Sequence, residues 1–155
     1  AQSLLGTPRR LINGVGGSIG SAIPFALAAR VFAPRAPVIA IMGDGTFGFH
    51  MAEFDTAVRH GLPFVAIIGN DATWNAEYQI QLRTYGDART HGCELLPSRY
   101  DKVVEALGGY GSLVEQVEEL TPALERALAS GKSACVNVMI ERVAAPVIRR
   151  PEKQS

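Results

Sequence analysis

Two apolar runs, each followed at once by glycine and an acidic residue, constrain the fold of this chain more than any other feature. Residues 38–46 read VIAIMGDGT and residues 64–73 read FVAIIGNDAT. Unbroken apolar runs of this length predict buried parallel strands, and residues 50–60 between them predict the crossover helix. Asp44 and Asp71, 27 positions apart, are then expected at the same carboxyl edge of one sheet, where open α/β sheets bind their ligands.

Composition narrows the class of protein. A chain of 155 residues with 47% hydrophobic and 19% charged residues predicts one globular domain. The formal net charge is zero, and this argues against nucleic acid as the main partner because such binding depends on neutralising phosphates. Cys93 and Cys135 lack metal-site spacing and are expected as buried free thiols in a reducing cytoplasm. No apolar run is long enough to span a bilayer.

The remaining pattern alternates helices with apolar strands and predicts a doubly wound, mostly parallel sheet flanked by helices. We expect a turn at the Gly-Asp-Gly motif, and Thr121 as N-cap with Pro122 in the first turn of the last helix. The domain is expected to cover residues 1–142, with residues 143–155 as a tail. The expected helices are residues 21–32, 50–60, 75–83, 101–107 and 121–130; the expected strands are residues 38–42, 64–69, 110–114 and 134–140.

The chemistry of the two motifs indicates a metal and a phosphate ligand. Two carboxylates beside glycines that let backbone N–H groups approach a phosphate suit a divalent metal with a diphosphate. The simpler interpretation makes Asp44 and Asp71 two loop aspartates that cap helices. The joint spacing, the two strands and the glycine cluster at residues 14–20 favour the metal site.

At these positions the chain resembles the diphosphate-binding domain of thiamine diphosphate-dependent enzymes. Within that family the acetolactate synthase-like group is nearest. Benzaldehyde lyase, 2-hydroxyacyl-CoA lyase and the 2-oxoacid decarboxylases are similar as well. The family motif is GDG, then somewhat under thirty residues, then a pair usually written NN. The resemblance runs from about residue 14 to residue 140. It implies a lyase or transferase, a carboligase acting on 2-oxo acids or hydroxy ketones, with thiamine diphosphate and Mg²⁺ as cofactors.

The resemblance also implies roles for individual residues. Asp44 and Asp71 would bind Mg²⁺ through their carboxylates and Thr73 through its backbone carbonyl. The segment that holds the aminopyrimidine would place Ile19 between the two cofactor rings. Trp74 and Glu77 would be candidates for substrate contact, although a packed aromatic and a solvated helix face are the alternative interpretations. The implied cofactor-binding residues are Gly17, Ser18, Ile19, Gly43, Asp44, Gly45, Thr46, Asp71 and Thr73.

The chain departs from the family pattern in two ways. Asp71 stands where asparagine is usual, which predicts tighter dependence on the metal because a negative charge is added beside a diphosphate. An opening strand and helix usual in the family and the separate pyrimidine-binding domain are not found in the sequence. We therefore expect an N-terminally truncated domain that is inactive alone and works with a pyrimidine-binding domain of the same or a neighbouring chain, in a homodimer or tetramer.

Three other functions compete with the carboligase. A 2-oxoacid decarboxylase is the near alternative, with Glu77 as its acid. A module that binds NAD-type dinucleotides is another, since Gly14, Gly16 and Gly20 fall one residue away from the Rossmann fingerprint. Against it, no strand is expected before the glycine cluster. A non-catalytic interaction domain that keeps the fold is the third.

Overall fold

The computed structural model describes residues 11–14 and 18–144. Its four strands form one parallel sheet in the order β1-β2-β4-β3. The strands are β1 (Ile39–Gly43), β2 (Val65–Asn70), β3 (Tyr110–Val114) and β4 (Ala134–Met139). The helices are α1 (Ala22–Phe32), α2 (Asp44–Gly48), α3 (Glu53–Arg59), α4 (Asn75–Tyr85), α5 (Tyr100–Ala106) and α6 (Val117–Ala129), with a 3₁₀ turn η1 (Asp87–Arg89).

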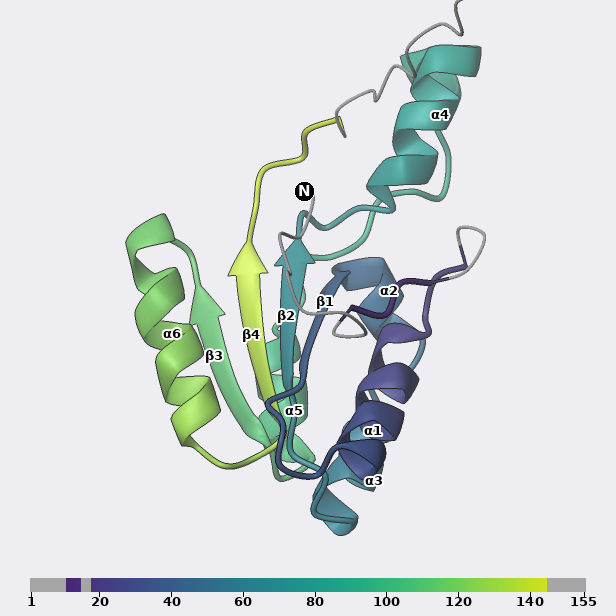
Figure 1. The fold of residues 1–155 in the computed structure, drawn as a ribbon. Coiled ribbons are helices and arrows are strands. Elements are labelled where there is room, and N and C mark those ends of the chain that lie inside the picture. The colour runs from purple at the N-terminus through teal and green to yellow at the C-terminus, as the bar shows by residue number, and fades with distance from the viewer. Residues whose placement is uncertain (1–10, 15–17, 145–155) are drawn as a thin grey trace, which may run out of the picture.

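Helices cover both faces of the sheet (Figure 1). On one face α1, α2, α3 and α5 bury alternate residues of β1, β2 and β4, with Phe47 and Phe54 packed at its centre. On the other face α6 lays Ala123 and Ala127 against β3 and β4. Alternate strand residues feed the two cores because successive side chains of a strand point to opposite faces. The expected doubly wound sheet is confirmed.

The four strands lie within one or two residues of their expected positions, but two helix starts were predicted wrongly. Residues 43–46 do not form a turn, since α2 begins at Asp44 and a separate helix, α3, follows. Helix α6 begins at Val117 and not at Thr121. Gln116 and Glu119 close a reciprocal capping box there, which leaves Pro122 inside the helix. The capping box provides hydrogen-bond partners for backbone N–H groups of the first helical turn, which have none within the helix. The helix therefore begins one turn earlier than the Thr121-Pro122 pair predicted.

Helix α4 stands apart from the two cores. None of its residues is buried, and it projects beyond the carboxyl edge of the sheet (Figure 1). It is tied down at its base, where Thr73 pairs with Glu94 in an isolated bridge and Asn75 donates to the Val143 carbonyl at 2.8 Å. Among the described residues no helix combines the length and the apolar character that crossing a membrane requires.

Candidate metal and diphosphate site

The register of the first two strands brings the acidic motifs together. β1 and β2 are adjacent and parallel, and Gly43 pairs with Gly69 at their carboxyl ends. Asp44 follows β1 directly as the first residue of α2, and Asp71 follows β2. The sequence prediction that both carboxylates share one edge of the sheet is therefore met by the fold.

Asp44 is the most unusual polar group of this edge. Only 2% of it is exposed, and its Oδ2 is a buried side-chain oxygen with no hydrogen-bond partner in the part of the chain that the structure describes. Its Oδ1 accepts from the Gly45 N–H at 2.8 Å. Burial raises the pKa of Asp44, and the negative charge of Asp71 raises it further, against weaker opposing hydrogen bonds from the Gly45 and Thr73 backbones. An uncompensated buried carboxylate is costly, and such oxygens pair with cations or bind metals.

The segment after β2 completes a set of oxygen donors. Thr73 is buried, and its hydroxyl donates to the Asp71 carbonyl at 3.1 Å. Asp71 and Thr73 follow the end of β2 and Asp44 follows the end of the adjacent β1, so all three predicted metal-binding residues lie at one edge of the sheet. Within the described part of the chain, no group of three or more His, Cys, Asp or Glu side chains could hold a metal ion. A cation here would rely on two carboxylates and backbone oxygen.

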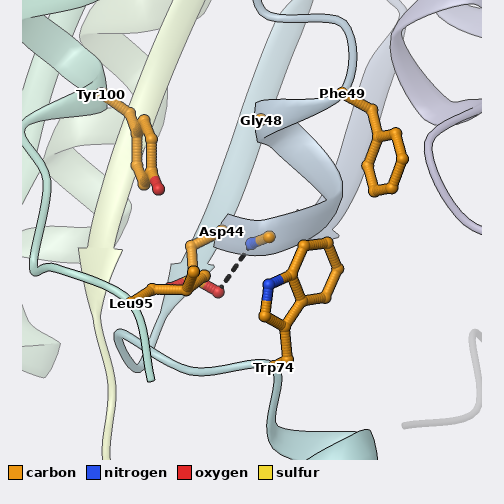
Figure 2. Close-up of a pocket in the computed structure, with 7 residues that line it drawn as sticks. Asp44, Gly48, Phe49, Trp74, Leu95 and Tyr100 are labelled. Carbon is orange, nitrogen blue, oxygen red and sulfur yellow. Dashed lines mark hydrogen bonds between the residues drawn. The ribbon is translucent and has the colours of Figure 1, made fainter. Parts of the chain in front are cut away.

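A pocket of about 290 Å³ opens beside Asp44. In Figure 2 Asp44 lies between Tyr100 on one side and Trp74 on the other. The indole of Trp74 meets the Phe49 ring edge-on, with the ring centroids 5.7 Å apart. The pocket therefore has one acidic group set among aromatic walls; its lining residues are Asp44, Gly45, Gly48, Phe49, Trp74, Leu95 and Tyr100.

Sequence reasoning missed several of these walls. Tyr100 was expected only to precede a helix, yet its ring faces the pocket, and burial together with the charge of Asp44 raises its pKa. Phe49 and Leu95 sit in segments with no motif of their own. No local signal could have found them, because tertiary packing brings these segments to the edge of the sheet.

Other predicted site residues lie elsewhere. Gly17 falls outside the described residues, while Ser18 is exposed and Ile19 is 51% exposed and does not line the pocket. The glycine segment is nevertheless anchored beside it, since His50 Nδ1 donates to the Gly20 carbonyl at 2.7 Å. Glu77 is exposed on the first turn of α4 and does not line the pocket either.

Gly43 and Thr46 flank the Asp44–Gly45 pair without lining the pocket. Gly43 ends β1 and Thr46 is half-buried in α2. A Cβ at Gly43 would come no closer than 3.9 Å to the Gly69 carbonyl oxygen. A side chain added at Gly43 would therefore meet less steric conflict than one added at Gly45.

Gly45→Ala is expected to displace the Trp74 indole. A Cβ at Gly45 would lie 2.7–2.8 Å from three indole carbons, so the variant should lose about 1–3 kcal/mol of stability and shift tryptophan emission to longer wavelength. Urea unfolding and fluorescence measure both effects, since Trp74 is the only tryptophan. In a Trp74→Ala background the same substitution should cost little. An equal cost in both backgrounds would show that the indole does not restrict Gly45.

The fold and this edge define a class: an open parallel α/β domain with an acidic, aromatic-walled pocket at the carboxyl ends of its strands. The family model described as "Thiamine pyrophosphate enzyme, C-terminal TPP binding domain" matches residues 2–138. The chain belongs to this family of thiamine diphosphate enzymes, as the motifs predicted.

Similar proteins carry several activities. The chain is 46% identical over 132 residues to a probable acetolactate synthase of Mycobacterium bovis, covering 84% of this chain and 24% of that protein. It is 37% identical over 133 residues to a 2-hydroxyacyl-CoA lyase 2 of Caenorhabditis elegans, covering 82% and 20%. A thiamine diphosphate-dependent 4-hydroxybenzoylformate decarboxylase of Rhodococcus jostii superposes with a TM-score of 0.73 at 26% identity, covering 79% and 23%. The chain thus spans about a quarter of the length of these relatives.

Proposed function

We propose that this chain binds thiamine diphosphate together with Mg²⁺, as the diphosphate-binding domain of an acetolactate synthase-like carboligase or lyase acting on 2-oxo acids or 2-hydroxy ketones. One observation carries the metal: the buried Asp44 Oδ2 has no hydrogen-bond partner among the described residues, and the negative charge of Asp71 acts on the same carboxylate. The donor set fits, because carboxylates and backbone carbonyls are hard oxygen ligands of the kind Mg²⁺ takes beside substrate phosphates.

Each residue of the site then has a defined task. Asp44 and Asp71 hold the metal through carboxylate oxygens and Thr73 through its carbonyl. Thr46 and Gly45, whose N–H donates to Asp44 Oδ1 in this structure, would offer backbone N–H groups to the diphosphate. Gly43 is the strand end that leads into them, and Gly17, Ser18 and Ile19 would hold the aminopyrimidine. Trp74 contributes an apolar wall that excludes water from the pocket. When bound, the cofactor supplies an electron sink for breaking or forming carbon–carbon bonds next to a carbonyl.

A decarboxylase is the second candidate, and the likeness to the Rhodococcus jostii decarboxylase supports it. Its acid would be Glu77, yet this side chain is exposed and away from the pocket wall. The geometry therefore favours the carboligase. The dinucleotide alternative loses support, since the family match points to thiamine diphosphate.

The proposal implies a partner domain. The glutamate that acts on the cofactor pyrimidine would come from a pyrimidine-binding domain of the same or a neighbouring chain, and a homodimer or tetramer would bring the two together.

Calorimetric titration with thiamine diphosphate tests the proposal. Binding is expected with Mg²⁺, loss of binding after chelation, and no binding of NAD⁺ as the control ligand. Binding of NAD⁺ in place of thiamine diphosphate, or binding of the cofactor that ignores the chelator, would count against the metal-linked site.

A further inference from the structure

Two asparagines are completely buried next to residues 71–73, the loop that carries the proposed metal-binding residues Asp71 and Thr73. Asn70 ends β2 and Asn137 lies in the neighbouring strand β4, and both are 0% exposed. Asn70 Nδ2 donates to Asn137 Oδ1 at 3.1 Å. Burying two amides is costly unless their polar atoms are paired, so the partners of this pair decide what it does.

Every amide group of the pair finds a partner. Both Nδ2 groups donate to the Ser98 carbonyl, each at 3.0 Å. Asn137 Nδ2 also reaches Asp101 Oδ1 at 3.4 Å. Burial alone would raise the pKa of Asp101, but the Arg99 guanidinium, bound through both carboxylate oxygens, outweighs it and holds that pKa below its ordinary value. A fully satisfied buried network of this kind is rigid.

The other end of the network holds a strained residue. Asn70 Oδ1 accepts from the Ala72 N–H at 3.2 Å, and the Ala72 carbonyl accepts from the Leu95 N–H at 2.8 Å. Ala72 has a φ of 53° and is the one non-glycine residue with positive φ among those described. A side chain in this region costs on the order of 1–3 kcal/mol and persists where the surroundings fix it, commonly at functional sites. Ala72 stands between Asp71 and Thr73.

We propose that Asn137 is a positioning residue, which acts through Asn70 to keep Ala72 left-handed and so fixes the spacing of the metal-binding residues Asp71 and Thr73. That Asp71 and Thr73 bind a metal rests on the proposed function. That Asn137 positions them rests on the hydrogen bonds described above. Asn137 does not line the pocket, so its effect on metal binding passes only through the loop. Removing the amide frees Asn70 Nδ2 from one partner and lets the loop sample other conformations.

Amide hydrogen exchange tests the positioning without any ligand. In the full 155-residue chain, Asn137→Ala should speed exchange of the Ala72 amide by about fivefold relative to the Ala66 amide in the core of β2. The loss of the hydrogen bond that holds Asn70, worth about 1 kcal/mol, accounts for this factor. Ser133→Ala is the matched control: it removes a buried hydroxyl of the segment before β4 that bonds to Leu62, and should speed both amides alike. If Asn137→Ala is too unstable to purify, Asn137→Ser gives the same comparison.

Metal affinity provides the second measurement. With thiamine diphosphate present, Mn²⁺ binding followed by electron paramagnetic resonance should weaken about 10–100-fold in Asn137→Ala and stay unchanged in Ser133→Ala. Unchanged relative exchange at Ala72, or equal Mn²⁺ affinity in wild type and Asn137→Ala, would overturn the positioning role. Failure of the wild type to bind Mn²⁺ with the cofactor would instead overturn the proposed function, and exchange at Ala72 alone would then decide the inference.

Discussion

Asp44→Asn is expected to weaken Mg²⁺-dependent binding of thiamine diphosphate by about 100-fold or more, and to raise the stability of the ligand-free chain. Loss of one buried charged contact, about 3 kcal/mol, accounts for the first effect. The second follows because Oδ2 of Asp44 is buried and meets no hydrogen-bond partner within residues 11–14 and 18–144. A neutral amide there removes a desolvation cost of about 1 kcal/mol. Calorimetric titration and urea unfolding measure the two effects.

The pH dependence of unfolding gives the same prediction a second readout. The pKa of Asp44 is raised above its ordinary 3.8 in the folded chain, so between the two values the folded state binds more protons than the unfolded state. The ligand-free wild type should therefore gain stability from this group as pH falls through the raised pKa. Asp44→Asn should lose that gain. Asp55→Asn is the control, because Asp55 is an exposed carboxylate of α3 that pairs with Arg59. This variant should change neither cofactor binding nor the pH dependence of unfolding. If Asp55→Asn lost the same pH-dependent stability, the effect of Asp44→Asn would be nonspecific.

Gly111→Ala is expected to give the largest loss of stability, about 3 kcal/mol, which corresponds to a fall in Tm of roughly 10 °C for a domain of this size. Gly111 lies in β3, where an added Cβ would overlap the backbone carbonyl of Asp101, with its carbon only 2.8 Å away. Backbone cannot rotate aside as a side chain can, so α5 must move off the sheet. Urea unfolding followed by circular dichroism measures the loss.

Gly48→Ala is the matched control for this substitution. A Cβ at Gly48 meets no atom within 4 Å, and its φ is not in the left-handed region. Its stability should change by less than about 1 kcal/mol, with helix propensity favouring alanine. Equal losses in the two variants would mean that the contact between β3 and α5 does not limit packing.

Local sequence predicted the parts of the fold that depend on neighbouring residues. Apolar runs located β1, β2 and β4, and the parallel register followed from the strand–helix–strand order. Placement of Asp44 and Asp71 at one edge needed nothing else, because the first residue after each of two adjacent parallel strands must lie there. The motifs then indicated the thiamine diphosphate enzyme family, and the family match confirmed that membership.

Contacts between distant residues could not be predicted. Asn70 and Asn137 are 67 positions apart, and Asn137 sits in a run that reads as an ordinary buried strand. Tyr100 reaches the pocket only because α5 packs on the sheet against β3 and β4. The start of α6 was missed for a local reason: Gln116 is a less common N-cap than Thr121, and its reciprocal bond with Glu119 outweighed the stronger propensity.

Helix α4 has a consequence for the dynamics of the pocket. With no buried residue and only 11 residues, it is shorter than a helix that holds its structure alone in water. Local unfolding should therefore begin in this segment, well before the sheet opens. Trp74 immediately precedes α4 and forms one wall beside Asp44, so fraying of α4 loosens that wall. One pocket thus joins the buried Asp44 at the sheet edge to a residue that leads into a helix with no buried side chain.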